Sequence, residues 1–303
     1  MRDLRPRLLV AAGLLAATLA TLTPLFRPGL WVSDEELHWP MRLAEFAEAL
    51  RQGQWWPRWF PDFQLGHGYP FPHFYAPGAL WLGLPLLLAT GSPVLAVKLA
   101  YGAAAFLAPW GMYRFVRLHR APRGAAFAAA LIYLFAPYHT LNIFVRGNLA
   151  ETLAMGLFPW MLWAVWRAAH RSDLSSVALA AVLTCAYQLS HNLSALFGTG
   201  ILVLLLIARG CFHRWAPRVW LRLALALTLG TLLGTVYWLP ALWDSRSVRV
   251  AEVAQTIVAA DHGIHWWQLF DPRWGWGYSV PGPADELSLQ LGAVQWLALA
   301  AGA

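Results

Sequence analysis

Nine apolar runs divide the 303-residue chain and constrain its fold more than any other feature. A helix that crosses a bilayer needs about 20 apolar residues, and somewhat shorter runs are tolerated. Charged residues make up only 12% of the chain, against about 25% in soluble domains, so these runs are not the buried helices of a soluble protein. The sequence predicts one integral membrane domain over residues 1–303, an all-α, polytopic bundle of about eight or nine membrane helices. The runs lie at residues 8–26, 78–90, 94–113, 124–137, 152–166, 174–189, 193–208, 219–239 and 287–303.

Three of these runs differ from the rest. Run 8–26 is long for the apolar core of a signal peptide and lacks a convincing cleavage site, so we expect an uncleaved first membrane helix. Run 78–90 contains Pro85 and stops at residues 91–93, so we expect that it does not cross the membrane. Run 287–303 reaches the last residue without a charged flank, which predicts that the natural protein extends further.

The distribution of charge predicts the orientation of the chain. With the N-terminus in the cytoplasm, the predicted inner segments carry 13 arginines and two acids, whereas the outer segments carry 8 arginines and 13 acids. This bias follows the positive-inside rule. We therefore expect a multi-pass protein of the cell membrane with two large extracytoplasmic loops, at 27–77 and 240–286. If run 78–90 crosses the membrane instead, every later segment is reversed.

Composition and motifs also exclude several classes of protein. The net charge of +7 lies in islands between apolar runs, so it points to the lipid bilayer as partner and not to nucleic acid. Two cysteines exclude a disulfide scaffold and a cysteine-rich zinc site. The chain lacks a phosphate-binding glycine loop, a His-Glu-x-x-His zinc motif and a Gly-x-Ser-x-Gly nucleophile turn. No cofactor is indicated, and a divalent metal held by outer histidines and carboxylates is compatible with the sequence although no spacing demands it.

The outer segments contain most of the unusual polar residues, and ionisable groups at membrane depth usually face a cavity. Asp34 lies at the expected membrane surface, where a carboxylate can act as a general base, with Glu35 and His38 as the other catalytic candidates. The candidates for substrate and phosphate binding are Arg42, His67, His73, Tyr138, His139, Arg146, Glu151, His191 and Asn192.

Residues 33–45 allow a structural and a functional interpretation. Ser33 and Glu36 match a helix capping box, which does not explain Asp34. A helix over this stretch would place Asp34, His38 and Arg42 on one face, because they are four residues apart. Pro40 would kink or restart such a helix.

The next outer segment is rich in proline and glycine, so we expect irregular structure over residues 53–75. Its tryptophans fit the headgroup region of a membrane. Residues 66–68 predict a tight turn that presents His67 or His73 to a site. Either histidine can equally be an ordinary loop residue.

Two later outer segments carry helix-start signals. Asn148 and Glu151 form a cap pattern, and Arg146 directly before that helix start would suit a phosphate. Alternatively, Arg146 pairs with Glu151 across the turn. Asn192 is predicted to cap the helix that follows it, whereas His191 has no evident structural role.

These residues resemble two related groups of membrane proteins. The acidic pair Asp34-Glu35 and the loop that follows it resemble the first loop of the GT-C glycosyltransferases. More narrowly, later motifs are similar to the bacterial membrane proteins labelled "6-pyruvoyl-tetrahydropterin synthase related", although nothing in the chain resembles a pterin enzyme. The motifs that carry the narrower resemblance are Tyr138, Arg146-Gly-Asn-Leu-Ala-Glu151, His191-Asn-Leu-Ser-Ala195, Trp238-Leu-Pro-Ala241 and Ser288-Leu-Gln-Leu-Gly292.

The resemblance implies a GT-C-like fold and a glycosyltransferase that moves a hexose or pentose from a polyprenyl-phosphate donor to an extracytoplasmic acceptor. It places Asp34 as the base on the acceptor, with Glu35 as the second candidate. Arg146 and His191 would then lie where basic residues can hold the donor phosphate. Two other functions stay open: a transporter or flippase of lipid-linked glycans, and a non-catalytic membrane scaffold.

The predicted orientation can be tested at position 119. A cysteine placed there should be protected from a membrane-impermeant thiol reagent added outside intact cells, because the arginine-rich segment 114–123 is predicted to be cytoplasmic. Labelling from the outside would contradict the topology.

Overall fold

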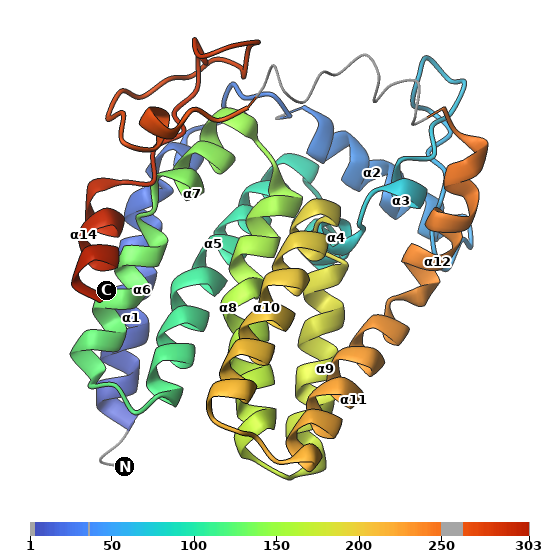
Figure 1. Cartoon of the computed structure of the whole chain (residues 1–303). Helices are drawn as coiled ribbons and strands as arrows, with labels where there is room; N and C mark the ends of the chain where they lie inside the picture. Colours follow the sequence, from blue (N-terminus) through green and yellow to red (C-terminus); the bar gives the residue numbers. More distant parts are fainter. Residues whose placement is uncertain (1–3, 36, 250–262, 303) are drawn as a thin grey trace.

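The computed structural model describes residues 4–35, 37–249 and 263–302, and over these residues the chain is an all-α bundle with no strand (Figure 1). The predicted all-α class is therefore confirmed, whereas the GT-C-like fold stays a prediction. The helices before the chain's midpoint are α1 (Leu4–Thr21), η1 (Thr23–Phe26), α2 (His38–Arg51), α3 (Phe71–Phe74), α4 (Gly78–Thr90), α5 (Pro93–Leu118), α6 (Arg123–Leu134), α7 (Pro137–Leu141) and η2 (Asn142–Arg146). The later helices are α8 (Leu149–His170), α9 (Leu174–Gln188), α10 (Asn192–Phe212), α11 (Pro217–Leu233), α12 (Thr235–Asp244), η3 (Ser245–Ser247), η5 (Trp266–Leu269) and α14 (Ala293–Gly302).

Fewer helices meet the requirements of a membrane span than the apolar runs suggested. Among the described residues, α5, α8 and α10 are long and apolar enough to cross a membrane. Two bent pairs, residues 123–146 and 217–247, raise the number to five if each counts as one span. Helix α4 has 13 residues and so extends for about 20 Å at 1.5 Å per residue, which is short of the roughly 30 Å hydrocarbon core. The count of eight or nine thus stays a prediction.

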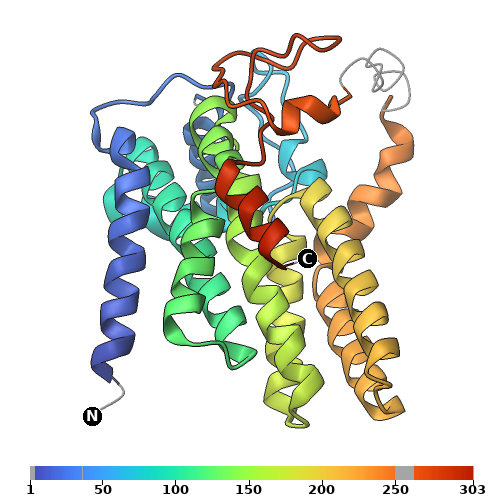
Figure 2. The ribbon, with the colours of Figure 1, turned by 60° about the vertical axis from the view of Figure 1, so that its left-hand side comes forward.

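The connections gather at two opposite ends of the bundle (Figures 1 and 2). One end, here named the loop end, carries residues 22–35, residues 52–77 and the segment 263–292. The other, named the basic end, carries the start of α1 and the short connections 119–122, 171–173 and 213–216. The segments predicted to share one side of a membrane therefore lie at one end of the molecule.

Helix α8 lies at the centre and packs against α5, α9, α10 and α11. Small side chains recur at every fourth position of α5, at Ala96, Ala100, Ala104 and Ala108, and all four are almost completely buried. Alanine and glycine let two helix backbones approach closely, which is a common way of packing helices in membranes. On α8, a Cβ added at Gly156 would lie 2.5 Å from the Ala104 carbonyl oxygen.

Two predicted spans are bent, and the sequence did not indicate this. Run 219–239 forms α11 and α12, which meet at Gly234 and differ in direction by 66°. Run 124–137 forms α6 and then turns by 45° into α7 and η2. Proline and glycine are the usual causes of sharp helix bends, and Pro137 and Gly234 lie at these two breaks. The bend at Gly234 turns α12 out of line with α11.

The α5–α8 seam predicts the effect of enlarging Gly156. Gly156→Ala should destabilise the protein by about 1–3 kcal/mol, because the new methyl group overlaps backbone that can move only if the helices separate. The thermal midpoint in detergent would measure this loss. Gly102→Ala on α5 is the matched control, since a Cβ there meets no atom within 4 Å. An equal midpoint for both variants would contradict the close packing.

Candidate functional site

The turn between η2 and α8 organises the polar residues of the loop end. Gly147 has a φ of +65°, and any Cβ at this position would collide with the Ser33 hydroxyl. The Tyr101 phenol donates to the Gly147 carbonyl, and the Asp34 amide donates to the Val145 carbonyl over 3.0 Å. The start of the first long loop is therefore fixed directly to this turn.

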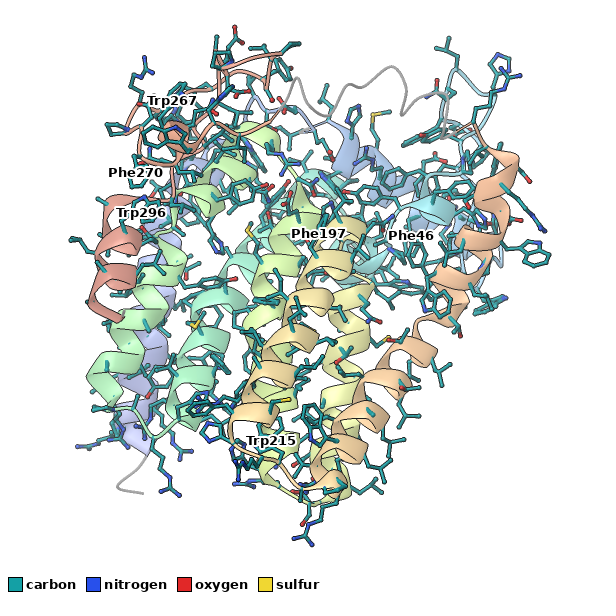
Figure 3. The ribbon with its side chains drawn as sticks, viewed as in Figure 1. Phe46, Phe197, Trp215, Trp267, Phe270 and Trp296 are labelled. Carbon is teal, nitrogen blue, oxygen red and sulfur yellow. The ribbon has the colours of Figure 1, made fainter. Side chains whose placement is uncertain are left out.

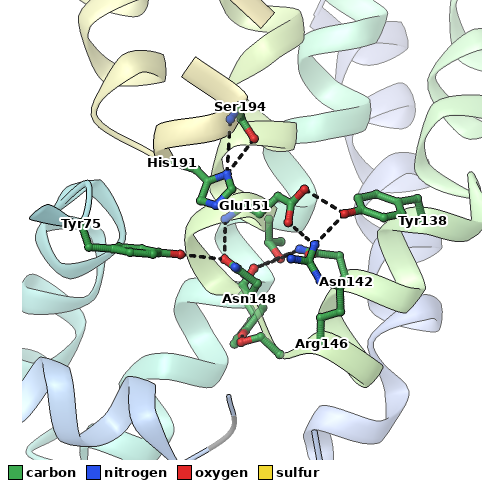
Figure 4. Close-up of polar contacts among 11 residues, drawn as sticks. Tyr75, Tyr138, Asn142, Arg146, Asn148, Glu151, His191 and Ser194 are labelled. Atoms are coloured by element: carbon green, nitrogen blue, oxygen red, sulfur yellow. Dashed lines mark hydrogen bonds and ion pairs between the residues drawn. The ribbon is translucent and has the colours of Figure 1, made fainter. Parts of the chain in front are cut away.

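Arg146 is held by a group of polar side chains on this turn (Figure 4). Its Nη1 donates to the Tyr138 hydroxyl over 2.6 Å, to Asn142 Oδ1 over 3.1 Å and to the Glu151 carboxylate. The Tyr138 hydroxyl in turn donates to Glu151 over 2.9 Å. The pairing of Arg146 with Glu151 across the turn, one of the two interpretations of the sequence, is thus observed.

The start of α8 brings Tyr75 to the same place. Asn148 caps the helix as predicted, since its Oδ1 accepts from the Glu151 amide over 2.9 Å. The same oxygen accepts a long hydrogen bond of 3.4 Å from the Tyr75 hydroxyl. Burial, reinforced by the charge of Glu35, raises the pKa of Tyr75 above its usual range, so the phenol stays a neutral donor.

The N-cap role predicted for Asn192 belongs to His191 instead. The N-cap of α10 is His191, whose Nδ1 accepts from the Ser194 amide at 3.4 Å and contacts the Ser194 hydroxyl at 2.9 Å (Figure 4). Asn192 is the first helical residue and joins three segments instead. Its side chain accepts from the Ala76 amide and the Tyr237 hydroxyl and donates to the Phe74 carbonyl. The prediction that Asn192 caps the helix was therefore wrong.

Arg42 forms a second charged group beside Tyr75. It pairs with Glu35 at 2.8 Å and stacks over the ring of Phe71 at 4.1 Å. The Arg42 side chain is only 13% exposed, and its Nε–H is buried without a hydrogen-bond partner among the described residues. A buried guanidinium with an unused donor is suited to an anionic ligand.

The predicted shared face of Asp34, His38 and Arg42 is not formed. Helix α2 begins only at His38, and so Asp34 lies in the turn before it. Asp34 and His38 are both exposed. Pro40 is tolerated because it falls in the first turn of the helix, where its missing N–H costs nothing. Glu36, the other half of the predicted capping box, lies outside the described residues.

The remaining histidines are separate from this group. His67 is exposed in the predicted turn, whose glycines Gly66 and Gly68 both have positive φ. His73 is buried between the Arg58 guanidinium, at 3.2 Å, and the Asp244 carboxylate, at 2.9 Å. His139 is buried edge-on against Tyr133, with ring centroids 4.8 Å apart. His73 therefore ties the first long loop to the end of α12.

A large groove opens beside Arg42 and Tyr75. It has a volume of about 1420 Å³ and runs between α10 on one side and α11 and α12 on the other. Its wall is mostly apolar along the helices, and its polar residues include Arg42, Tyr75, Asn192 and Tyr237. Phe197 of α10 lies near the loop end of the bundle (Figure 3), and Arg42 lies at the same end. The apolar residues that α10 and α12 contribute to the wall are Ala195, Leu196, Val203, Leu204, Trp238, Ala241 and Leu242.

Sequence reasoning missed the groove and three residues that shape it. Tyr75 and Tyr237 lie within or next to segments that carried the resemblance. Nothing in the sequence indicated that Tyr75 contacts Asn148, or that Tyr237 contacts Phe74 and Asn192. Arg58 reaches the Val236 carbonyl, which lies 178 residues away in the chain. Contacts between residues so far apart in the chain leave no periodic pattern in the sequence. Among the described residues, no group of three or more His, Cys, Asp or Glu side chains could hold a metal ion.

A helical bundle with three to five apolar helices and a groove between them defines an integral membrane protein. The model of the "6-pyruvoyl-tetrahydropterin synthase related domain; membrane protein" family matches residues 73–256, more than half of the chain. The chain therefore belongs to this family, as its motifs suggested. No curated protein matches the sequence. The matched range contains His73, Arg146 and His191 but not Asp34 or Arg42.

The burial of His191 predicts that stability depends on pH. Burial lowers the pKa of this imidazole, with the Arg146 charge acting the same way and Glu35 and Glu151 opposing it. Between that lowered pKa and the ordinary value of 6.5, the unfolded chain binds more protons than the folded chain. Stability should therefore fall as the pH decreases through this window.

The thermal midpoint at pH 7.5 and pH 5.5 measures this effect. His191→Asn keeps a residue that can cap the helix but cannot titrate, so its midpoint should fall less than that of the wild type. His67→Asn, at an exposed position, should keep the full wild-type decrease. The same decrease in all three proteins would show that His191 is not responsible.

Proposed function

We propose that this protein is a membrane glycosyltransferase of the GT-C type, which transfers a sugar from a polyprenyl-phosphate donor to an acceptor hydroxyl. The observation that carries the proposal is the apolar groove with a buried arginine at its polar end. A ligand with a long hydrocarbon tail and an anionic head matches both parts of this surface.

The groove suits the tail of such a donor. Its volume of about 1420 Å³ exceeds the 300–1,000 Å³ typical of sites for small soluble ligands. One wall belongs to α10, which is long and apolar enough to cross a membrane. Leu196 and Leu204 on that wall are each 67% exposed, so the protein itself leaves apolar surface there for a hydrocarbon chain.

Arg42 is the residue best placed to bind the phosphate. It lines the groove, and its Nε–H lacks a partner among the described residues. Arg146, which we expected in this role, is engaged by Glu151, Tyr138 and Asn142. In the proposal, Arg42 neutralises the negative charge of the donor phosphate. Arg146 stabilises the turn at residues 146–148. Tyr75, whose ring lies beside Arg42, contributes a neutral hydroxyl that donates to Asn148.

The transfer needs a base for the acceptor. In the proposal, Asp34 removes the proton of the acceptor hydroxyl as its oxygen attacks the anomeric carbon of the donor. The bond between that carbon and the phosphate oxygen breaks, and the polyprenyl phosphate leaves with the electron pair, stabilised by Arg42. Asp34 is exposed at the loop end and fixed through its amide to Val145, which supports this role. Glu35 is occupied by its ion pair with Arg42.

The proposal also assigns the orientation. The loop end is extracytoplasmic, and the basic end, with the N-terminus, is cytoplasmic in a multi-pass protein of the cell membrane. The arginines Arg7, Arg114, Arg117, Arg123, Arg167 and Arg171 support this, because they line one cavity at one end of the bundle.

A flippase for lipid-linked glycans is the second candidate, because an open apolar groove would also carry a lipid without any chemistry. The two functions differ in what the loop-end carboxylate does. A transferase needs Asp34 for turnover, whereas a flippase produces no transferred sugar at all.

A sugar-transfer assay on purified protein in lipid tests the base. With a panel of polyprenyl-phosphate sugars, Asp34→Asn should lower turnover about 10²–10⁴-fold, which is the usual contribution of general base catalysis. Glu48→Gln on α2 removes a half-exposed carboxylate and should keep wild-type turnover. Turnover that survives Asp34→Asn would move the base to Glu35 or His38, and no turnover with any donor would favour the flippase or a scaffold.

Arg42→Gln tests the phosphate contact in the same assay. The KM for the donor should rise about 10–100-fold, because a hydrogen bond to a charged group contributes about 1.5–3 kcal/mol. Arg51→Gln removes an exposed arginine of the same helix, which is paired with Glu48, and should change KM little. Equal KM values for the two variants would remove Arg42 from the donor site.

A further inference from the structure

A second cavity lies at the basic end, apart from the groove. It has a volume of about 450 Å³, and six of its lining residues are arginines. These arginines come from the start of α1, the end of α5, the start of α6 and the end of α8. Among the described residues that line it, none is an acid. The six arginines are Arg7, Arg114, Arg117, Arg123, Arg167 and Arg171.

Three of these arginines are oriented by neutral groups of the described residues. Arg114 stacks over Trp163 with its guanidinium carbon 4.7 Å from the ring centroid. Arg117 donates to the Ala121 carbonyl, and Arg167 donates through Nε to the Ser176 hydroxyl over 3.0 Å. That hydroxyl in turn donates to Asp173. A guanidinium carries five N–H donors, and the contacts of Arg117 and Arg167 each use one of them.

Like charges so close together repel each other. The charges of Arg7 and Arg167 both act on Arg114. Such a cluster is favourable when an anion neutralises it, and guanidinium groups that are stacked and held in plane are suited to bidentate contacts with phosphate. The positive-inside rule alone explains arginines at this end, but it does not require six of them from four helices to converge on one cavity.

We infer that this pocket binds a phosphate-bearing anion, supplied either by a phospholipid headgroup or by a soluble phosphate compound. Basic pockets between membrane helices are known to hold anionic headgroups. The pocket is independent of the proposed transferase, because it lies at the opposite end of the bundle from Arg42 and Tyr75 (Figure 1).

Two binding measurements distinguish the sources. Native mass spectrometry of the protein in neutral detergent would report the retention of cardiolipin against phosphatidylcholine. Calorimetry with inorganic pyrophosphate would report a soluble anion. Preferential binding of cardiolipin assigns a lipid headgroup, and binding of pyrophosphate assigns a soluble phosphate. Binding of neither probe overturns the inference.

Paired substitutions show whether the arginines of this pocket bind the anionic probe. Arg114→Gln with Arg167→Gln should weaken binding of the anionic probe at least tenfold. Arg214→Gln with Arg218→Gln removes the same charge at the same end but outside the pocket lining, and should leave binding unchanged. An equal loss in both pairs would mean general attraction of anions and overturn the site.

A single substitution covers the case in which the first pair does not fold. Arg171 is exposed but lines the pocket, and Arg218 is exposed and does not. Arg171→Gln should weaken binding of the same probe, whereas Arg218→Gln should not. Equal affinities for these two variants would overturn the inference without depending on a destabilised protein.

Discussion

The turn at residues 146–148 is the constraint on which the rest of the loop end depends. Asn142 is completely buried beneath it and donates to the Asn148 carbonyl and the Thr152 hydroxyl. A buried amide with its hydrogen bonds satisfied fixes one geometry, because every alternative leaves a polar group unpaired. Above it, Gly147 lacks a Cβ and so leaves room for Ser33, and Arg146 forms an ion pair with Glu151. The first long loop, α8 and Tyr75 all take their positions from this turn.

The groove follows from a different feature, the break at Gly234. A continuous helix over 219–239 would keep α12 in line with α11, whereas the 66° bend directs α12 outward. Its far end is then held by the His73–Asp244 contact, and its start by Tyr237, which donates to Asn192. The apolar space thus ends at a polar rim that includes Arg42. The two cavities place an apolar site at one end of the bundle and a cationic one at the other.

Features that depend on local sequence could be predicted, and those that depend on distant contacts could not. The apolar runs predicted the helical class, and the Asn148 cap followed from the residue types at a helix start. The role of His191 as a cap was missed because histidine is an unusual residue there. The pairing of Arg42 with Glu35 was missed because we extended α2 too far toward the N-terminus. His73 meets Asp244 across 171 residues, and no spacing in the sequence encodes such a contact.

In the proposed function, the groove between α10 and α12 holds the tail of a lipid phosphate. A polyprenyl phosphate with a photoreactive diazirine in its tail tests this most directly, with the labelled peptides identified by mass spectrometry. The account predicts labels on the groove wall, at Leu196, Val203 and Leu204 of α10 and at Leu242 of α12. Labels spread equally over the exposed apolar positions of α1, such as Leu8 and Leu9, would contradict it.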